Sequence, residues 1–347
     1  MRPVFDELVV DCLGFAVKPH KGPGSPTWSW LIWVGKGGGE ARNRADDEDM
    51  KTEATYAVVV TDLDDTLFDW VGLWHKCFTA MLDRVLELSG LDREPVLDDF
   101  RAVHQRHGTA EYAFALQELS CLLKREGSPQ AIKEKYAPAI EAYRAARRKH
   151  LRLYPTVLEG LVELRGRGCL VVGYTESLAF YSNYRVRRLG LDGILDYLFS
   201  PEDHDIPEHL SEVGLRRYRE EAYRFRHTIH DHTPKGELKP NPKVLADIIA
   251  EVGAQQSETI YVGDKLHKDV LMAKRAGVMD VHARYGQSHE RQEYELLKRV
   301  THWTPEMVKK EAETTHDDVK PTHAISRFRE LLDVCCFRQF EGNVKRK

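Results

Sequence analysis

An acidic cluster directly behind a short apolar run is the feature that most limits how this chain can fold. Residues 57–60 read Ala-Val-Val-Val, and residues 62–66 read Asp-Leu-Asp-Asp-Thr. Small β-forming side chains bounded by charged segments predict a buried strand. Because side chains alternate along an extended chain, Asp62 and Asp64 are expected to project to the same side where this strand ends.

The close spacing of Asp62 and Asp64 suggests a cation between them. Two carboxylates held that close repel each other unless a cation lies between them or one of them takes a proton. A hard divalent ion such as Mg²⁺ prefers oxygen ligands and commonly uses one or two carboxylates. The simpler interpretation is an acidic turn at the end of a strand, so the choice depends on the residues downstream.

Three later segments deliver polar residues in comparable settings. Residues 169–174 and 259–262 are further apolar runs that predict strands. Residues 236–242 place a lysine just before a helix with an Asn cap and a first-turn proline. In an open parallel α/β sheet, ligands bind beyond the carboxyl ends of the strands, so these side chains are expected to meet at one place. In chain order they are Thr175, Lys239, Asp264 and Asp269.

The ordered set of motifs resembles the four motifs of the haloacid dehalogenase (HAD) superfamily of hydrolases, in the phosphatase type with a helical cap inserted after the first motif. The resemblance covers residues 56 to about 285. It implies an α/β fold with a Rossmann-like parallel sheet core and an inserted α-helical cap domain. It also implies a Mg²⁺ cofactor.

The resemblance assigns catalytic roles residue by residue. Asp62 would be the nucleophile that forms an aspartyl-phosphate. Asp64 would protonate the leaving oxygen and then take a proton from the hydrolytic water. Thr175 would hydrogen-bond the phosphoryl oxygens. Lys239 would pair with both the nucleophile and the phosphoryl group, which makes it a catalytic and a substrate-binding residue.

The resemblance also assigns the metal site. Mg²⁺ would be held by Asp62, Asp64 and Asp264, with Asp64 contributing chiefly its backbone carbonyl. Asp269 would support the site, either as a ligand or from behind the ligands.

These roles predict a Mg²⁺-dependent phosphatase that hydrolyses a small phosphomonoester. An ester leaves as an alkoxide and benefits from the proton donor Asp64, which a dehalogenase does not need. Transport ATPases of the superfamily carry Lys where this chain has Leu63. The alternatives are a non-catalytic binding or regulatory protein of the same fold, a nucleic-acid end phosphatase, a phosphotransferase and a dehalogenase.

Net charge, apolar runs and cysteine content limit which binding partners are expected. The net charge of −4 gives no drive toward nucleic acid or an anionic membrane, and no run approaches the ~18 apolar residues of a membrane span. The six cysteines include no Cys-x-x-Cys pair, which favours a reduced setting. A cytoplasmic enzyme is therefore expected, with a small phosphorylated metabolite as its partner and neither nucleic acid nor membrane.

The predicted organisation surrounds a discontinuous core. Met50 is a candidate for the true start, because a short polar lead and the first strand follow it. The predicted parts are a flexible N-terminal extension (1–55), the α/β core (56–67 and 154–285) with its own insertion (201–234), the helical cap (68–153), and a C-terminal helical extension with a basic tail (286–347).

Periodicity and helix signals predict the helices of the inserted parts. Within the cap, helices are expected over residues 67–88, 110–126 and 128–150, the last kinked at Pro138. In the 201–234 insertion a helix is expected near residues 213–225. The C-terminal helices are expected over residues 288–300, from 304 onward, and over 324–334.

Some polar and aromatic residues in the insertions have two interpretations. Trp70, Trp74 and His75 either line the substrate pocket or pack between cap and core. A basic cluster in the cap either binds phosphate or is a solvated helix face; it comprises Arg101, His104, Arg106 and His107. The histidines of the 201–234 insertion are expected to belong to a helical excursion beside the active-site mouth and not to a second metal site. They are His204, His209, His227, His230 and His232.

Overall fold

The computed structural model describes residues 54–203, 224–315 and 317–342. The predicted N-terminal extension, Met50 as a start, most of the helix expected near residues 213–225 and the basic tail lie outside these ranges. Within the ranges that are described, no helix has the length and apolar character needed to cross a membrane.

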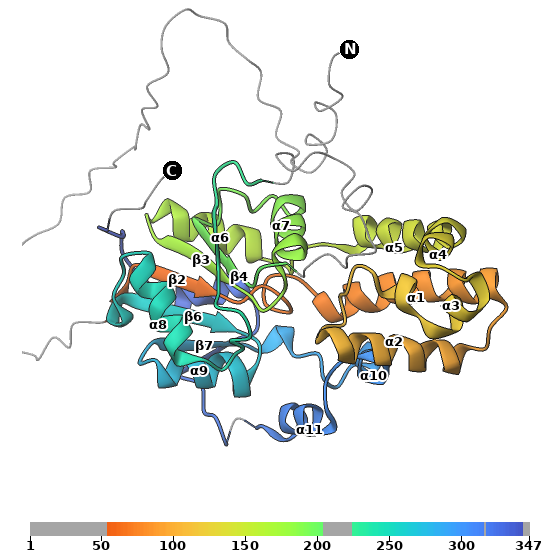
Figure 1. Cartoon of the computed structure of the whole chain (residues 1–347). Helices are drawn as coiled ribbons and strands as arrows, with labels where there is room; N and C mark the ends of the chain where they lie inside the picture. Colours follow the sequence, from red (N-terminus) through yellow and green to blue (C-terminus); the bar gives the residue numbers. More distant parts are fainter. Residues whose placement is uncertain (1–53, 204–223, 316, 343–347) are drawn as a thin grey trace, which may run out of the picture. The chain divides into compact units, whose positions relative to one another are not determined.

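A seven-stranded sheet forms the core (Figure 1), and every neighbouring pair of its strands is parallel. Its order is β5-β4-β3-β2-β6-β7-β8. The predicted fold class, an α/β protein with a parallel Rossmann-like sheet, is confirmed. The strands are β2 (Val58–Thr61), β3 (Leu170–Tyr174), β4 (Tyr197–Ser200), β5 (Ile229–His232), β6 (Thr259–Gly263), β7 (Met279–Ala283) and β8 (His323–Ile325).

Both faces of the sheet are covered by helices, which explains why the central strands are apolar throughout. Along β2, Val59 packs toward α6 (Val157–Gly166) and α7 (Ala179–Arg188). Its neighbours Val58 and Val60 pack toward α8 (Pro242–Glu251) and α9 (Leu271–Arg275). Because side chains alternate along the strand, each face of the sheet carries its own apolar core. Figure 1 shows the helices that cover the two faces, above and below the sheet.

The sheet topology places the predicted motifs together. β2 lies at the centre, between β3 and β6, and all three run in the same direction. Their carboxyl ends therefore lie at one edge, where Asp62, Thr175 and Asp264 follow β2, β3 and β6. This edge is where ligands bind in open α/β sheets.

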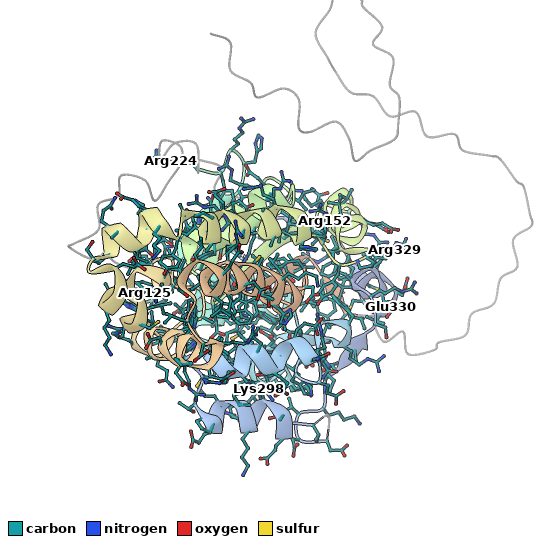
Figure 2. The ribbon with its side chains drawn as sticks, turned by 90° about the vertical axis from the view of Figure 1, so that its right-hand side faces the viewer. Arg125, Arg152, Arg224, Lys298, Arg329 and Glu330 are labelled. Atoms are coloured by element: carbon teal, nitrogen blue, oxygen red, sulfur yellow. The ribbon has the colours of Figure 1, made fainter. Side chains whose placement is uncertain are left out.

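The cap is a helical unit with its own apolar core. Figure 2 views it from outside, with α1 between α5 above and α10 below; Lys298 marks α10. The cap helices are α1 (Trp70–Ser89), α2 (Arg93–His107), α3 (Ser120–Glu126), α4 (Pro129–Lys135) and α5 (Ala137–His150), with a 3₁₀ turn at Ala115–Glu118.

The structure corrects the predicted cap helices in three places. Residues 93–107 form a helix whose bounds were not predicted, although Val96, Phe100 and Val103 make an apolar stripe on it. Residues 110–114 are not helical, so the helix expected over 110–126 begins later. The helix expected over 128–150 is interrupted at Tyr136, because Pro138 starts a second helix instead of kinking one.

The segment after residue 285 is more than the helical extension that was expected. Its first helix, α10 (Gln292–Val300), packs on α1 and α2 and adds Tyr294, Leu297 and Val300 to the cap core. After α11 (Pro305–Glu313), β8 returns to the main sheet beside β7.

The last described segment is also only partly helical. The short helix α12 (Leu331–Val334) accounts for the end of the helix expected over 324–334. It leads into β9 (Cys336–Phe337), which pairs with β1 (Thr55–Tyr56) in a separate two-stranded sheet. The 201–234 insertion likewise contains a strand, β5, at the edge of the main sheet.

Candidate active site

The end of β2 carries the first predicted site residue. The backbone N–H of Asp62 donates to the carbonyl of Val262 at 2.8 Å, so the ladder with β6 continues past the end of β2. Its buried carboxylate accepts a hydrogen bond from Lys239 Nζ at 2.5 Å. The strand thus presents a carboxylate that is paired with an ammonium at the carboxyl edge of the sheet.

Lys239 reaches this carboxylate from the segment just before α8. Asn241 caps that helix by accepting from two backbone N–H groups of its first turn, which fixes where the preceding chain enters the site. Lys239 Nζ also donates to Asp269 at 3.0 Å and to the carbonyl of Tyr174 at 3.2 Å. All three partners are acceptors, so the ammonium has a complete set of hydrogen bonds.

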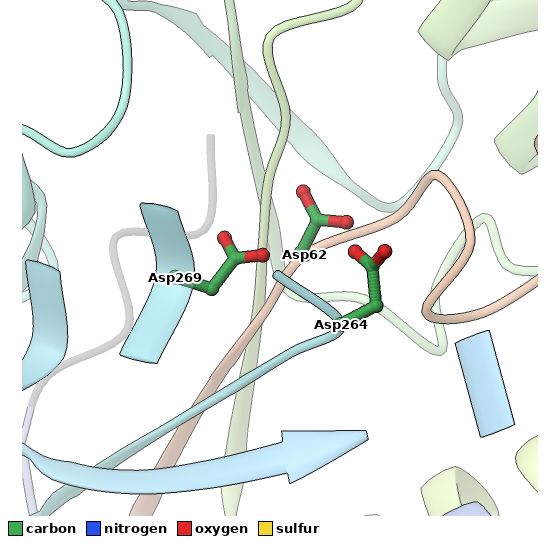
Figure 3. A group of neighbouring side chains, drawn as sticks. All are labelled: Asp62, Asp264 and Asp269. Atoms are coloured by element: carbon green, nitrogen blue, oxygen red, sulfur yellow. The ribbon is translucent and has the colours of Figure 1, made fainter. Parts of the chain in front are cut away.

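Two more carboxylates come from the segment after β6. Asp264 follows the strand directly, and Asp269 lies one helical turn later. Asp269 accepts hydrogen bonds from the Tyr261 hydroxyl at 2.9 Å and from the backbone N–H of Lys265 at 3.1 Å. Oxygens of Asp62, Asp264 and Asp269 lie within 4.8 Å of one another, as the converging side chains in Figure 3 show.

Burial sets the protonation behaviour of these residues. It raises the pKa of Asp62 to about 7, although Lys239 opposes the change. It also raises the pKa of Asp264 well above its ordinary value. At Asp269 burial acts in the same direction, but Lys239 and several hydrogen bonds outweigh it and lower the pKa. We refer to Asp62, Lys239, Asp264 and Asp269 as the core cluster.

The core cluster fits a divalent cation. Its donors are carboxylate oxygens, the ligand type that Mg²⁺ prefers. Lys239 supplies one positive charge close to two of the three carboxylates, Asp62 and Asp269. The raised pKa values of Asp62 and Asp264 show that the cluster would gain from further positive charge.

Asp64 enters a different set of contacts, although it is two residues from Asp62. Its carboxylate accepts from the hydroxyls of Thr175 at 3.0 Å and Ser177 at 2.7 Å, and from the Arg185 guanidinium at 3.0 Å. Within the described residues, the group that can hold a metal therefore contains the Asp269 side chain and not that of Asp64. The predicted use of the Asp64 backbone carbonyl stays a prediction.

Thr175 lies where the motif predicts, at the end of β3. Its backbone N–H donates to the carbonyl of Phe199 at 3.0 Å, and its hydroxyl accepts from the backbone N–H of Ser177. The same hydroxyl donates to Asp64, so Thr175 connects the second motif to the first. Its predicted role toward phosphoryl oxygens stays a prediction.

Several site residues, including Ser177 beside Asp64, were not predicted from the sequence. Glu176 accepts from the Lys239 backbone N–H at 2.8 Å and from Lys268 Nζ at 2.6 Å. Tyr261 and Arg185 contact Asp269 and Asp64, as described above. Glu176 follows Thr175 directly, so its position was a usable signal. Arg185 lies within a helix and belongs to no motif.

The aromatic and basic candidates of the cap are mostly structural. Trp74 is buried, stacks on Phe78 and donates to the carbonyl of Ala110 at 3.3 Å, so it packs inside the cap. His104 is buried too, and its Nδ1 lies 2.7 Å from the carbonyl of Val300. His104 is therefore not on a solvated face of the cap.

The other candidates of the insertions are placed as follows. Trp70 and His75 are both half-buried. Trp70 packs against the cap core and against the core on the α6–α7 side of the sheet. His107 Nε2 lies 2.8 Å from Glu118 Oε2. Among the described residues, His227, His230 and His232 do not form a metal-binding group. The other two histidines, His204 and His209, lie outside the described ranges.

Comparison with known proteins gives the family. The profile described as haloacid dehalogenase-like hydrolase matches residues 56–277, and a second one described as HAD-hydrolase-like matches residues 238–331. The first match covers more than half of the chain. The chain therefore belongs to the haloacid dehalogenase-like hydrolase family.

The individual relatives share only about a quarter of their residues with this chain over the matched regions. A glyceraldehyde 3-phosphate phosphatase from Methanopyrus kandleri is 26% identical over 80% of this chain and 95% of its own length. One from Pyrococcus furiosus is 23% identical over 67% of this chain and 82% of its own length. Among solved structures, a 2-haloacid dehalogenase from Pseudomonas syringae pv. Tomato DC3000 matches 81% of this chain and 98% of its own, with 16% identity and a TM-score of 0.49. The family and the names of the relatives confirm the predicted enzyme class, a phosphatase-type hydrolase of this family.

Proposed function

We propose that this chain is a Mg²⁺-dependent phosphatase that hydrolyses a small phosphomonoester through an aspartyl-phosphate on Asp62. The observation that carries the proposal is the separation of two carboxylates at the end of β2. Asp62 lies in the core cluster beside Lys239, whereas Asp64 faces Thr175, Ser177 and Arg185. A nucleophile and a proton donor need such different surroundings.

In the first half of the reaction, an Asp62 oxygen attacks phosphorus and the bond to the ester oxygen breaks. Asp64 gives its proton to the departing alkoxide. In the second half, water attacks phosphorus of the aspartyl-phosphate, Asp64 takes a proton from that water, and inorganic phosphate and the Asp62 carboxylate are released. The same pair of residues thus serves both steps.

Charge neutralisation is the main demand of this chemistry, because an anion attacks an anion. Lys239 is held between Asp62 and Asp269, where its positive charge would attract the incoming phosphoryl oxygens. Thr175 offers a hydroxyl at the same edge of the sheet. Bound Mg²⁺, held by Asp62, Asp264 and the Asp64 backbone carbonyl and supported by Asp269, would supply the remaining positive charge.

A triose phosphate is the first substrate to test, because both relatives described above are named glyceraldehyde 3-phosphate phosphatase. The direct experiment measures inorganic phosphate released from glyceraldehyde 3-phosphate and from a panel of sugar, polyol and carboxylate phosphomonoesters, with and without Mg²⁺. We expect release that requires the metal and stops on chelation. No release from any member of the panel, or full activity after exhaustive chelation, would contradict the proposal.

A further inference from the structure

Arg185 connects the cap to the candidate proton donor. It lies on α7 and is almost completely buried. One end of its guanidinium, Nη1, donates to Asp64 Oδ1 at 3.0 Å and to the Ser177 hydroxyl at 2.9 Å. The other end, Nη2, donates to Glu111, which belongs to the cap. A single side chain therefore touches both Asp64 and the inserted domain.

The geometry around Arg185 leaves it little freedom. A guanidinium is a planar fork, so fixing one end also orients the other. The rings of Phe68 and Tyr181 lie 5.6 Å and 5.7 Å from its central carbon. Ser177 Oγ accepts from Arg185 and donates to Asp64 Oδ2 at 2.7 Å, which closes the network around the carboxylate.

The cap holds Glu111 in place from several sides. The Thr109 hydroxyl accepts from the Glu111 backbone N–H at 3.1 Å, and Trp74 donates to the carbonyl of the residue before it. Tyr112, the next residue, donates to Glu118 at 2.6 Å. Glu111 is therefore carried on an ordered part of the cap, and its carboxylate is directed into the core.

We propose that Arg185 and Glu111 are positioning residues for Asp64, so that contact between cap and core sets the proton donor in place. The inference rests on the proposed phosphatase function. Glu111 fixes one end of the guanidinium, and the other end holds Asp64 where a leaving oxygen would arrive. Without Glu111, Arg185 keeps its charge but loses the contact that defines its orientation. We refer to Asp64, Ser177, Arg185 and Glu111 as the cap junction.

This role has a specific kinetic signature. A poor leaving group such as an alkoxide depends on proton donation, whereas 4-nitrophenolate leaves readily without it. Disturbing the cap junction should therefore slow hydrolysis of an alkyl phosphate far more than hydrolysis of 4-nitrophenyl phosphate. A purely structural role would slow both substrates by the same factor.

The experiment uses the full chain with Mg²⁺, the alkyl ester that the wild type hydrolyses best in the panel, and 4-nitrophenyl phosphate. Glu111→Gln and, separately, Arg185→Lys are expected to lower the alkyl kcat about 10- to 100-fold and the aryl kcat by less than about 3-fold. Glu126→Gln is the matched control, because Glu126 also lies in the cap and binds Lys135 and Tyr136 there, away from Asp64 and Arg185. It should leave the ratio of the two rates unchanged.

A double variant separates positioning from general damage. In an Asp64→Asn background, adding Glu111→Gln should change the residual alkyl rate by less than about 2-fold, because the residue being positioned is gone. Equal losses on both esters, or a full additional loss in that background, would overturn the inference while leaving the phosphatase proposal intact. If the wild type hydrolyses neither ester, the proposed function fails and the inference falls with it. Thermal melting of each variant identifies any that does not fold, and Glu111→Asp then replaces it with the same expected ratio.

Discussion

The core cluster and the cap junction start two residues apart in the sequence, yet different parts of the fold hold them. Asp62 is held by Lys239 at the centre of the sheet, and all its partners belong to the core. Asp64 is held through Arg185, whose other partner is in the cap. The difference teaches that two carboxylates of one acidic motif can be held by different parts of the fold.

The turn that follows Asp64 is stabilised by the next residue. Asp65 has a positive φ of 61°, a left-handed conformation that a non-Gly residue adopts at some cost. Its carboxylate accepts from the backbone N–H groups of Trp70 and Val71 at 2.9 and 3.1 Å, which stabilises the start of α1. The turn therefore follows Asp64 directly and leads the chain into the first helix of the cap.

The largest expected effect is at the nucleophile. Asp62→Asn removes the attacking charge while keeping the shape of the side chain, so turnover should fall by about 10⁴-fold or more on every phosphomonoester. Steady-state phosphate release from aryl and alkyl esters would measure it. Because Asn is uncharged, the variant should remain folded, and retained turnover would show that the core cluster is not the reacting centre.

Asp64→Asn should discriminate between leaving groups. Hydrolysis of alkyl phosphates should fall about 10²- to 10⁴-fold, in the range of general acid–base catalysis, and hydrolysis of 4-nitrophenyl phosphate considerably less. The comparison of kcat for the two ester types tests the division of roles. Identical losses for Asp62→Asn and Asp64→Asn on both ester types would remove the distinction between the two regions.

Removing the ammonium of the core cluster should have a smaller but general effect. Lys239→Ala leaves Asp62 and Asp269 without their shared cation. We expect a loss of about 2–4 kcal/mol in transition-state stabilisation, expressed in both KM and kcat. Lys243→Ala is a matched control, because this exposed lysine lies four residues further on, in the first turn of α8, and pairs with Asp247 instead of with the core cluster. Unchanged kinetics in Lys239→Ala would make the lysine motif accidental.

The smallest expected effect concerns stability and needs no substrate. Burial raises the pKa of Asp62 to about 7 from an ordinary 3.8, so between these values the folded state binds more protons than the unfolded state. Without metal, stability should therefore fall as the pH rises through this range. Mg²⁺ binds the charged form, so the increase in Tm on adding Mg²⁺ should be larger at pH 8 than at pH 5.5.

Differential scanning fluorimetry across this pH range, with and without Mg²⁺, would record the effect. Asp62→Asn is the control, since it has no carboxyl to titrate at that position and should show a flatter pH dependence. An increase in Tm that is equal at both pH values in the wild type would contradict the assignment of Asp62 to the metal site.

The core cluster was open to prediction from sequence because its residues follow strands at fixed positions. The runs at residues 57–60, 169–174 and 259–262 are strongly apolar, since both faces of the central strands are covered. Parallel strands then bring whatever follows them to one edge. The positions of Asp62 and Asp264 thus depend on local pattern and topology alone.

The cap junction could not be predicted in the same way. Arg185 and Glu111 are 74 residues apart, and their pairing depends on how the cap meets the core. Neither belongs to a motif, and each reads as an ordinary charged residue of a helix or loop. Contacts of this kind are set by tertiary packing, which no local periodicity records.

The edges of the sheet were missed for a related reason. β5 reads Ile-His-Asp-His and β8 reads His-Ala-Ile. Both are more polar than the central strands, and β8 has only three residues. Edge strands pack on fewer neighbours, so their sequences carry a weak apolar signal. Helix α2 carries an apolar stripe, but it also has Pro95 in its first turn and many charged residues, which weaken the sequence signal for a helix.

The path of α10 has a mechanical consequence for the cap. The chain leaves the core after β7, contributes Tyr294, Leu297 and Val300 to the cap core, and returns to the sheet as β8. The Arg291 guanidinium also donates two hydrogen bonds, of 2.8 and 2.9 Å, to the carboxylate of Asp69 at the start of α1. An inserted domain that is joined to the core by two connecting segments can rotate about a single axis. Here the segments before and after α10 add two more covalent connections to the core, and they restrict this rotation. Any rotation of the cap must therefore move α10 with it.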